Sequence, residues 1–148
     1  MIAKAVQTFG KVDKLVCCAG VTFIGSLETT NSETFMRELS INLGGVFNMC
    51  KAAVPELKKQ PDATIVTVGS DLGVRPIPER IGYCPSKAGV IMLTKCIALE
   101  YAPAIRVNCI LPGLVRTPMI DSASKRRRIR RLWKNPMPPC IRCIKWAR

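Results

Sequence analysis

The sequence predicts a layered α/β domain built on a parallel sheet. Three short apolar runs, residues 14–20, 63–70 and 105–113, have the length and composition of buried strands. Two longer segments with helical spacing of apolar residues, 32–59 and 83–101, separate these runs. Strands that alternate with helices long enough to cross over favour parallel pairing.

Each predicted element has a local reason in the sequence. KLVCCAG ends in a glycine turn, ATIVTVGS is rich in β-branched residues, and IRVNCILPG is stopped by its proline and glycine. Asn31 or Ser32 can cap the first long helix, and the Gly44–Gly45 pair within it indicates close packing or a distortion. The segment DLGVRPIPER is expected to be a loop before the second long helix.

Charge divides the chain into a body and a basic tail. With 148 residues, of which 48% are hydrophobic, the chain can bury one core. Residues 1–121 hold 13 Lys and Arg against 10 acids, a net charge of +3, whereas residues 122–148 hold 10 Lys and Arg and no acid. We therefore expect one domain over residues 1–121 and a non-homologous or disordered tail over residues 122–148.

Composition also indicates in which cellular compartment the protein is expected. There is no apolar run of membrane-spanning length, and the first residues do not form the apolar block of a signal peptide. Several cysteines lie in apolar patterns, where free thiols are common, so no disulfide framework is expected. The sequence predicts a cytoplasmic protein.

Candidate catalytic residues lie where the predicted strands end, because ligands of open α/β sheets bind beyond the carboxyl ends of the strands. Ser70 follows the second strand, and Tyr83 and Lys87 begin the second long helix on the same rim. An i, i+4 pair shares a helical face, so we expect the ammonium to lower the tyrosine pKa from about 10. Such a pair alone is usually only a solvated face, but a serine opposite favours carbonyl reduction or alcohol oxidation.

These motifs together resemble the short-chain dehydrogenase/reductase family. KVDKLVCCAG, INLGGVF, IVTVGS, YCPSKAGV and IRVNCILPGLVRTP occur in the family's order over about residues 1–120. The resemblance implies a Rossmann-like doubly wound parallel sheet, NAD or NADP as cofactor and a small carbonyl or alcohol substrate. No metal-binding residues are predicted. The resemblance also implies a homo-oligomer, since the two long helices correspond to those through which family members commonly pair.

The resemblance further implies a role for individual residues. Tyr83 would be the general acid/base, Lys87 would lower its pKa and bind the nicotinamide ribose, and Ser70 would orient the substrate carbonyl. Asn42 would hold the water that links Lys87 to solvent. The implied cofactor contacts are, besides Tyr83 and Lys87, the residues Cys17, Ala19, Gly20, Pro112, Gly113 and Thr117.

The sequence departs from the family's pattern at both ends. It has no T-G-x-x-x-G-x-G loop to hold a pyrophosphate, and the residue that separates NAD from NADP is missing too. Cys17 and Cys18 stand where the family has the asparagines of N-N-A-G, and the family's lid, last helix and final strand do not follow PGLVRTP. We expect a partial fold without the N-terminal βαβ unit and the C-terminal helix and strand, poorly stable and of impaired activity.

The tail leaves several interpretations open. KRRRIRR with Trp133 fits a nuclear-localisation or RNA-binding run, and equally a basic helix on an anionic membrane. Cys140 and Cys143 form a single C-x-x-C in a chain without histidine, which disfavours a zinc site. An out-of-frame or intron-derived tail is the preferred interpretation. The competing function is a non-catalytic interaction protein that uses this tail, although the balanced body makes nucleic acid an unexpected partner.

Overall fold

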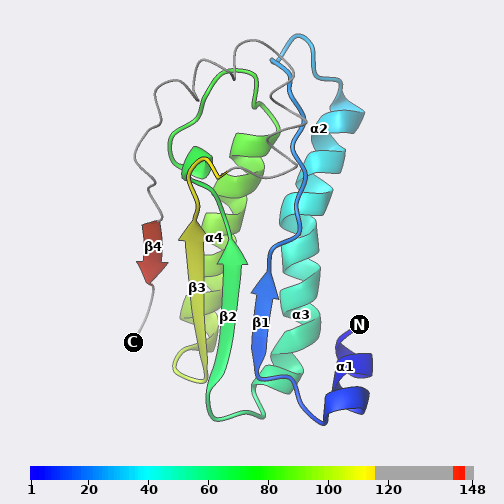
Figure 1. The fold of residues 1–148 in the computed structure, drawn as a ribbon, viewed down its shortest axis with the longest axis vertical. Coiled ribbons are helices and arrows are strands. Elements are labelled where there is room, and N and C mark those ends of the chain that lie inside the picture. Colours follow the sequence, from blue (N-terminus) through cyan, green and yellow to red (C-terminus); the bar gives the residue numbers. More distant parts are fainter. Residues whose placement is uncertain (116–141, 146–148) are drawn as a thin grey trace.

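The computed structural model describes residues 1–115 and 142–145. Its sheet has the strand order β1-β2-β3-β4 (Figure 1). The three predicted strands, β1 (Lys14–Cys17), β2 (Ala63–Val68) and β3 (Ile105–Leu111), pair in parallel, which confirms the predicted topology. The sequence did not predict β4 (Arg142–Lys145), which pairs antiparallel with β3.

Each parallel strand ends before the residues that mark its turn. β1 ends at Cys17, β2 at Val68 and β3 at Leu111, so their glycines and the residues around them lie beyond the carboxyl edge of the sheet. Side chains pack closely around Gly69, since a Cβ there would lie 2.6 Å from a methyl of Leu111, which would have to move. The sheet therefore presents three short backbone segments at one edge.

The predicted helix over 32–59 is continuous but distorted. It consists of α2 (Ser32–Leu39), the π-helical segment η1 (Ser40–Gly44) and α3 (Gly45–Leu57). The Oδ1 atom of Asn31 caps α2 by accepting the backbone N–H of Thr34 at 2.8 Å. The distortion that the glycine pair indicated is thus a π turn, a feature that is frequent at functional sites. The remaining helices are α1 (Ile2–Phe9), the 3-10 turn η2 (Asp71–Gly73) and α4 (Tyr83–Tyr101).

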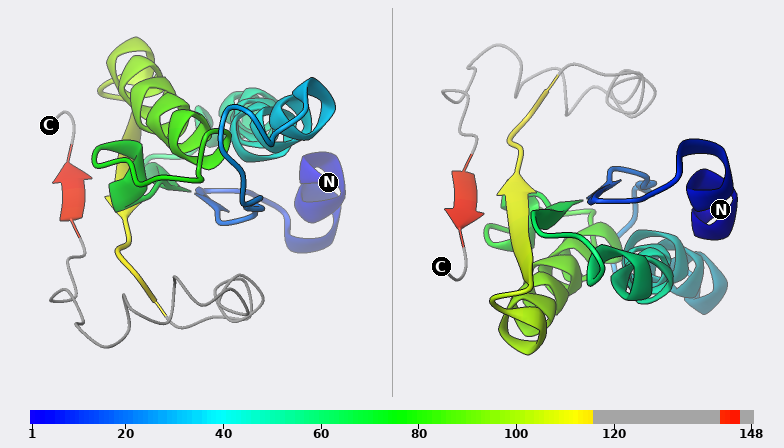
Figure 2. Two further views of the ribbon diagram at one scale, coloured as in Figure 1. Left: turned by 90° about the horizontal axis from the view of Figure 1, so that it is seen from above. Right: turned by 90° about the horizontal axis from the view of Figure 1, so that it is seen from below.

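Helices α2, α3 and α4 cover one face of the sheet and α1 lies at its β1 edge, as the two end-on views show (Figure 2). Leu15, Ile65 and Val107 form one row across the strands on the covered face, and all three are buried. Val16, on the opposite face, is 59% exposed. The described residues therefore bury one face of the sheet.

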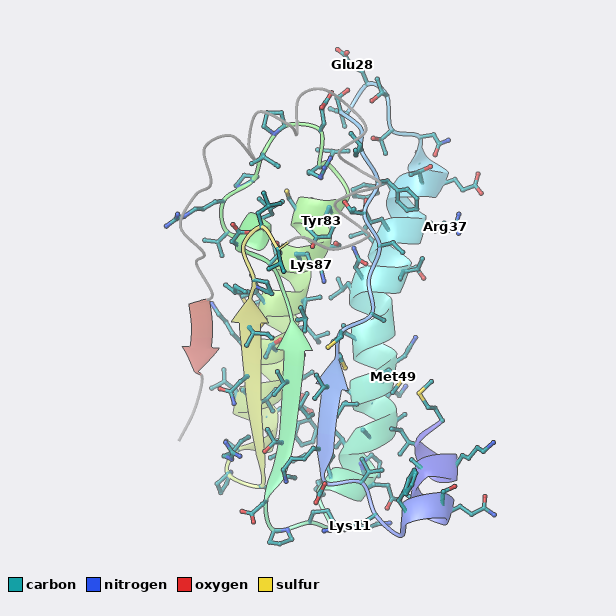
Figure 3. The ribbon with its side chains drawn as sticks, viewed as in Figure 1. Lys11, Glu28, Arg37, Met49, Tyr83 and Lys87 are labelled. Atoms are coloured by element: carbon teal, nitrogen blue, oxygen red, sulfur yellow. The ribbon has the colours of Figure 1, made fainter. Side chains whose placement is uncertain are left out.

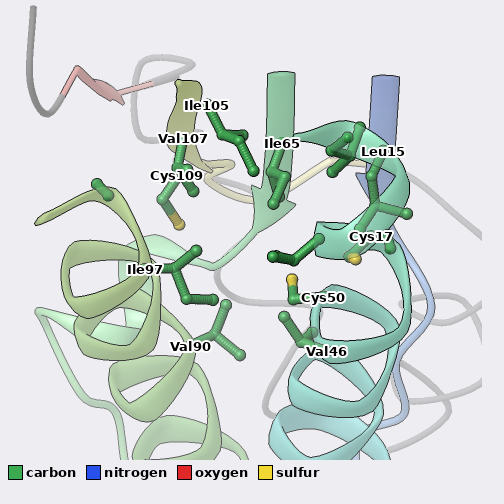
Figure 4. Close-up of a cluster of buried hydrophobic side chains, with 14 of the residues drawn as sticks. Leu15, Cys17, Val46, Cys50, Ile65, Val90, Ile97, Ile105, Val107 and Cys109 are labelled. Carbon is green, nitrogen blue, oxygen red and sulfur yellow. The ribbon is translucent and has the colours of Figure 1, made fainter. Parts of the chain in front are cut away.

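The core lies between the sheet and the helices α3 and α4 (Figure 4). Two polar contacts lie within it. The hydroxyls of Thr67 on β2 and Thr94 on α4 are 2.7 Å apart, and the thiols of Cys17 and Cys50 share a hydrogen bond. The first contact fixes α4 against β2, and so fixes the start of α4 relative to the carboxyl edge.

Candidate active site

Ser70, Tyr83 and Lys87 come together at the carboxyl edge of the sheet. Ser70 lies two residues after the end of β2 and is buried, and Tyr83 and Lys87 lie in the first turns of α4, where Figure 3 labels them. The Ser70 hydroxyl oxygen accepts the backbone N–H of Leu72 at 3.2 Å, which makes it the N-cap of η2. The tyrosine, the serine and the lysine thus occupy the places that the sequence predicted.

A close backbone contact holds η2 against α4. A Cβ at Gly73 would lie 2.9 Å from the backbone nitrogen of Ala88 and 2.9 Å from the carbonyl carbon of Lys87. Only glycine fits at this distance without displacing backbone. This approach sets the separation between the Ser70 hydroxyl and the Tyr83 phenol.

The electrostatics of Tyr83 differ from the sequence-based expectation. The pKa of Tyr83 is raised, mainly because burial disfavours the phenolate, while its hydrogen bond with the Ser70 side chain lowers it. The negative charges of Asp71 and Glu38 raise this pKa further. The prediction that Lys87 lowers the Tyr83 pKa is wrong for this structure, because burial and the neighbouring carboxylates decide the direction.

The position of Lys87 explains part of this difference. Lys87 is 5% exposed, and its Nζ donates to the backbone oxygen of Val68 at 2.9 Å. The ammonium also lies over the Tyr83 ring, 5.7 Å from the ring centroid. Burial lowers the pKa of Lys87 itself. In this structure the lysine is anchored to the end of β2 and stacks on the tyrosine ring.

Asn42 is fully buried within the π turn and all its bonds are internal. Its Oδ1 accepts the backbone N–H of Val21 at 2.8 Å, and its Nδ2 donates to the Val21 oxygen at 2.9 Å and to Ser86 Oγ at 2.9 Å. Ser86 Oγ in turn donates to the backbone oxygen of Tyr83 at 2.7 Å. Asn42 therefore links the loop after β1 to the turn of α4 that carries Tyr83.

The predicted cofactor residues after β1 reach this centre through Gly20. A Cβ at Gly20 would lie 3.1 Å from Asn42 Oδ1 and 3.5 Å from Lys87 Nζ, so the backbone passes close to the lysine. Ala19 is exposed, whereas Cys17 is buried beneath it at the end of β1. In the next residues, Thr22 Oγ1 is buried and finds no hydrogen-bond partner among the described residues.

The segment after β3 lies beside the same edge. The backbone oxygen of Pro112 accepts the N–H of Asp71 at 3.1 Å, which joins this segment to the start of η2. Gly113 is half-buried. Thr117, the last predicted cofactor residue, lies outside the described residues, as do KRRRIRR and Cys140.

The described part of the chain offers neither a metal site nor a membrane span. Residues 1–115 and 142–145 contain no group of three or more His, Cys, Asp or Glu that could hold an ion. Within the same residues, no helix is long and apolar enough to cross a bilayer.

Comparison with known proteins decides the family. A family model described as short chain dehydrogenase matches residues 1–128. The chain belongs to the short-chain dehydrogenase family. The mixed helix and parallel-sheet architecture agrees, because the ligand-free aldohexose dehydrogenase of Thermoplasma acidophilum superposes with a TM-score of 0.82 at 30% identity, covering 93% of this chain and 51% of that one.

Two curated relatives are oxidoreductases by name. The 3-oxoacyl-(acyl-carrier-protein) reductase FabG of Thermotoga maritima is 38% identical over 138 residues, or 93% of this chain and 56% of the relative. The 2-(R)-hydroxypropyl-CoM dehydrogenase of Xanthobacter autotrophicus is 38% identical over 122 residues, or 80% of this chain and 49% of the relative. This short-chain dehydrogenase therefore spans about half the length of the curated relatives it matches.

Three residues at the centre of this short-chain dehydrogenase were missed by sequence reasoning. Ser86 joins Asn42 to Tyr83, and its position three residues after Tyr83 was the available signal, since i, i+3 residues are helical neighbours. Glu38 and Arg80 are both buried nearby. Glu38 stands four residues before Asn42, on the same side of the helical segment, but acidic residues are seldom buried, so this spacing is a weak signal.

Proposed function

We propose that this chain carries the proton-transfer centre of an NAD(P)(H)-dependent oxidoreductase acting on a carbonyl or a secondary alcohol. The observation that supports it most is that Lys87 Nζ lies over the ring of the half-buried Tyr83, whose phenol also interacts with the Ser70 side chain. A hydrogen-bond donor, an acid/base and a cation thus face one edge of the sheet. Their roles follow from this arrangement.

Tyr83 would donate its phenolic proton to the oxygen of a substrate carbonyl. A pKa raised by burial keeps the phenol protonated near neutral pH, which suits the reductive direction. Ser70 Oγ would hold the same substrate oxygen, and the family's nicotinamide, when bound, supplies the hydride that adds to the carbonyl carbon. The proton from Tyr83 and this hydride together complete the alcohol.

The residues around Lys87 fit the ribose side of a dinucleotide. Gly20 leaves space next to Lys87 Nζ that any side chain would fill, and the buried Thr22 hydroxyl lacks a partner among the described residues. Lys87 and Tyr83 would hold the nicotinamide ribose, with Pro112 and Gly113 beside the nicotinamide.

The substrate class is an oxo or hydroxy compound with an apolar body. Leu72, Val74 and Ile77 follow Ser70, and Val74 is 58% exposed beside the edge. The names of the two relatives, a 3-oxoacyl reductase and a hydroxypropyl dehydrogenase, are compatible with this class.

Dinucleotide binding tests the proposal directly. We expect NADH or NADPH fluorescence to change saturably on titration with the purified chain, and the better of the two identifies the cofactor. Tyr83→Phe should still bind but more weakly, because it keeps the ring under Lys87 and loses the hydroxyl that would contact the ribose. The same variant should abolish any reduction of a carbonyl substrate, because the proton donor is gone.

Two outcomes would count against the proposal. A folded sample that binds neither dinucleotide at millimolar concentration has no cofactor site of its own. Carbonyl reduction that persists in Tyr83→Phe at the wild-type rate would mean that another group supplies the proton.

We also propose that two copies of the chain pair through α2–α3 and α4. An apolar groove of about 610 Å³ runs between these helices. Phe47 and Met92 line it and are 48% and 56% exposed, which is unusual for a surface that stays in water. The remaining lining residues are Met36, Leu39, Ser40, Leu43, Gly44, Gly89 and Leu93.

A charge placed in this groove is expected to separate the copies. Phe47→Glu should shift the sedimentation coefficient from that of an oligomer to that of a monomer, since a buried unpaired carboxylate opposes association. Leu27→Glu is the matched control, because Leu27 is exposed in the loop before α2 and does not line the groove. A wild-type chain that sediments as a monomer at all concentrations would contradict this assignment.

A further inference from the structure

Glu38 is a charged side chain buried at the junction of α2, α4 and the loop after β1. It is 2% exposed, near the end of α2. Its Oε1 accepts the backbone N–H of Phe23 at 3.2 Å. Buried carboxylates are rare unless they are paired or hydrogen-bonded, so the burial of Glu38 needs a structural explanation.

The second carboxylate oxygen faces the start of α4. A side chain at Gly82 would collide with Oε2 of Glu38, so the carboxylate lies directly against the N-cap residue of α4. An anion at a helix N-terminus interacts favourably with the helix dipole. Gly82 immediately precedes Tyr83, so the contact is one residue from the proposed acid.

Backbone contacts connect the same two segments. Gly25 forms a parallel bridge with Arg80, and the N–H of Gly25 donates to the oxygen of Glu79 at 3.1 Å. Arg80 is itself buried, and its Nη1 donates to the Glu79 oxygen at 3.0 Å. Glu38 therefore lies between a loop and a helix start that already touch.

We propose that Glu38 is a positioning residue for Tyr83. The buried carboxylate of Glu38 ties the loop of residues 21–25 to the N-terminus of α4. The inference rests on the proposed function in treating Tyr83 as the acid. One oxygen holds the loop at Phe23, and the other lies against the helix at Gly82. Removing the carboxylate should loosen both segments while the sheet stays intact.

The charge of Glu38 gives the proposal a second, independent readout. Glu38 raises the pKa of Tyr83 by repulsion of the phenolate. The other groups that act on the phenol are the hydroxyl of Ser70, the carboxylate of Asp71 and the thiol of Cys84, with the ammonium of Lys87 over its ring. Arg80 is the cation that acts on Glu38 itself. A neutral group at position 38 should thus lower the Tyr83 titration midpoint.

Three variants separate these effects. Glu38→Gln removes the negative charge but keeps a hydrogen-bond acceptor for the Phe23 N–H. Glu38→Met removes both the charge and the acceptor and has a side chain of similar length. Glu33→Gln is the matched control, because Glu33 is exposed in the first turn of the same helix. All are made in a Tyr101→Phe background, which leaves Tyr83 as the only tyrosine of the chain.

Hydrogen exchange and tyrosine absorbance are then measured without any cofactor. In Glu38→Met we expect amide exchange in residues 21–25 and 80–84 to be about tenfold faster or more, as loss of a hydrogen bond to a charged acceptor implies. Glu38→Gln should show a smaller acceleration and a lower Tyr83 titration midpoint. Glu33→Gln should change neither.

The outcomes decide the proposal independently of the dinucleotide titration. Unchanged exchange in Glu38→Met, or acceleration spread evenly over the whole sheet, would show that Glu38 does not tie these two segments. A Tyr83 midpoint that Glu38→Gln leaves in place would also overturn it. If both readouts behave as expected and the chain binds no dinucleotide, the tie stands and only the proposed function fails.

Discussion

Replacing Asn42 with leucine is expected to lower the free energy of unfolding by about 3 to 5 kcal/mol, an unusually large effect for a polar side chain. The variant keeps the volume but leaves both backbone groups of Val21 without their partner and deprives Ser86 Oγ of its donor. Each unpaired buried group costs about 1 to 3 kcal/mol. The loss should be visible in urea unfolding as a lower midpoint with an unchanged slope.

Asn48→Leu provides the comparison, because Asn48 is exposed on α3 only two turns further along. A leucine there changes the same atoms without breaking any described hydrogen bond of its side chain. If the two variants lose stability equally, the links that Asn42 makes carry little free energy and the π turn is held by its backbone alone.

The fold was predictable because its elements are set by local patterns. The runs at Lys14, Ala63 and Ile105 and the helix from Tyr83 to Tyr101 begin where the sequence predicts them. Parallel pairing follows from the lengths of the crossovers. In contrast, β4 was not predictable, because its four residues lie in a basic segment and show no run of β-branched or aromatic residues.

The candidate site was predictable in its members but not in its electrostatics. Helical spacing placed Tyr83 beside Lys87, and the strand end placed Ser70 opposite. The direction of the Tyr83 pKa depends on burial and on Glu38, which comes from another helix. Such tertiary contributions cannot be read from the spacing of two residues.

The same contrast explains why Asn42 was assigned a different task. A sequence resemblance implies a water held for a proton relay, whereas the structure shows an amide whose bonds join two backbone segments. The water-holding role stays a prediction, since the described bonds use only the side chain of Asn42. Through Ser86 the amide reaches the backbone oxygen of Tyr83, so the π turn, the loop after β1 and the start of α4 form one connected unit.

Lys87→Met is expected to weaken dinucleotide binding by about 10- to 100-fold, because hydrogen bonds to a charged donor contribute about 1.5 to 3 kcal/mol. Methionine retains the apolar stem over the Tyr83 ring and removes only the ammonium, so the loss reports on the charge. Lys58→Met is the control, since Lys58 is exposed at the end of α3. Equal affinity of wild type and Lys87→Met in the fluorescence titration would remove Lys87 from the proposed cofactor site.

The difference in stability between wild type and Lys87→Met should depend on pH, and it should change in favour of wild type as the pH rises. Burial lowers the pKa of Lys87 below the ordinary lysine value of 10.5, so at neutral pH the folded state carries the cost of a buried charge. As the pH rises through the lowered pKa, the folded lysine loses its proton before the unfolded one. Wild type should therefore gain stability relative to Lys87→Met until about pH 10.5, because the unfolded chain then binds more protons. Urea unfolding of both proteins at neutral and alkaline pH measures this difference, and a difference that stays constant would mean that the Lys87 ammonium is fully solvated in the folded chain.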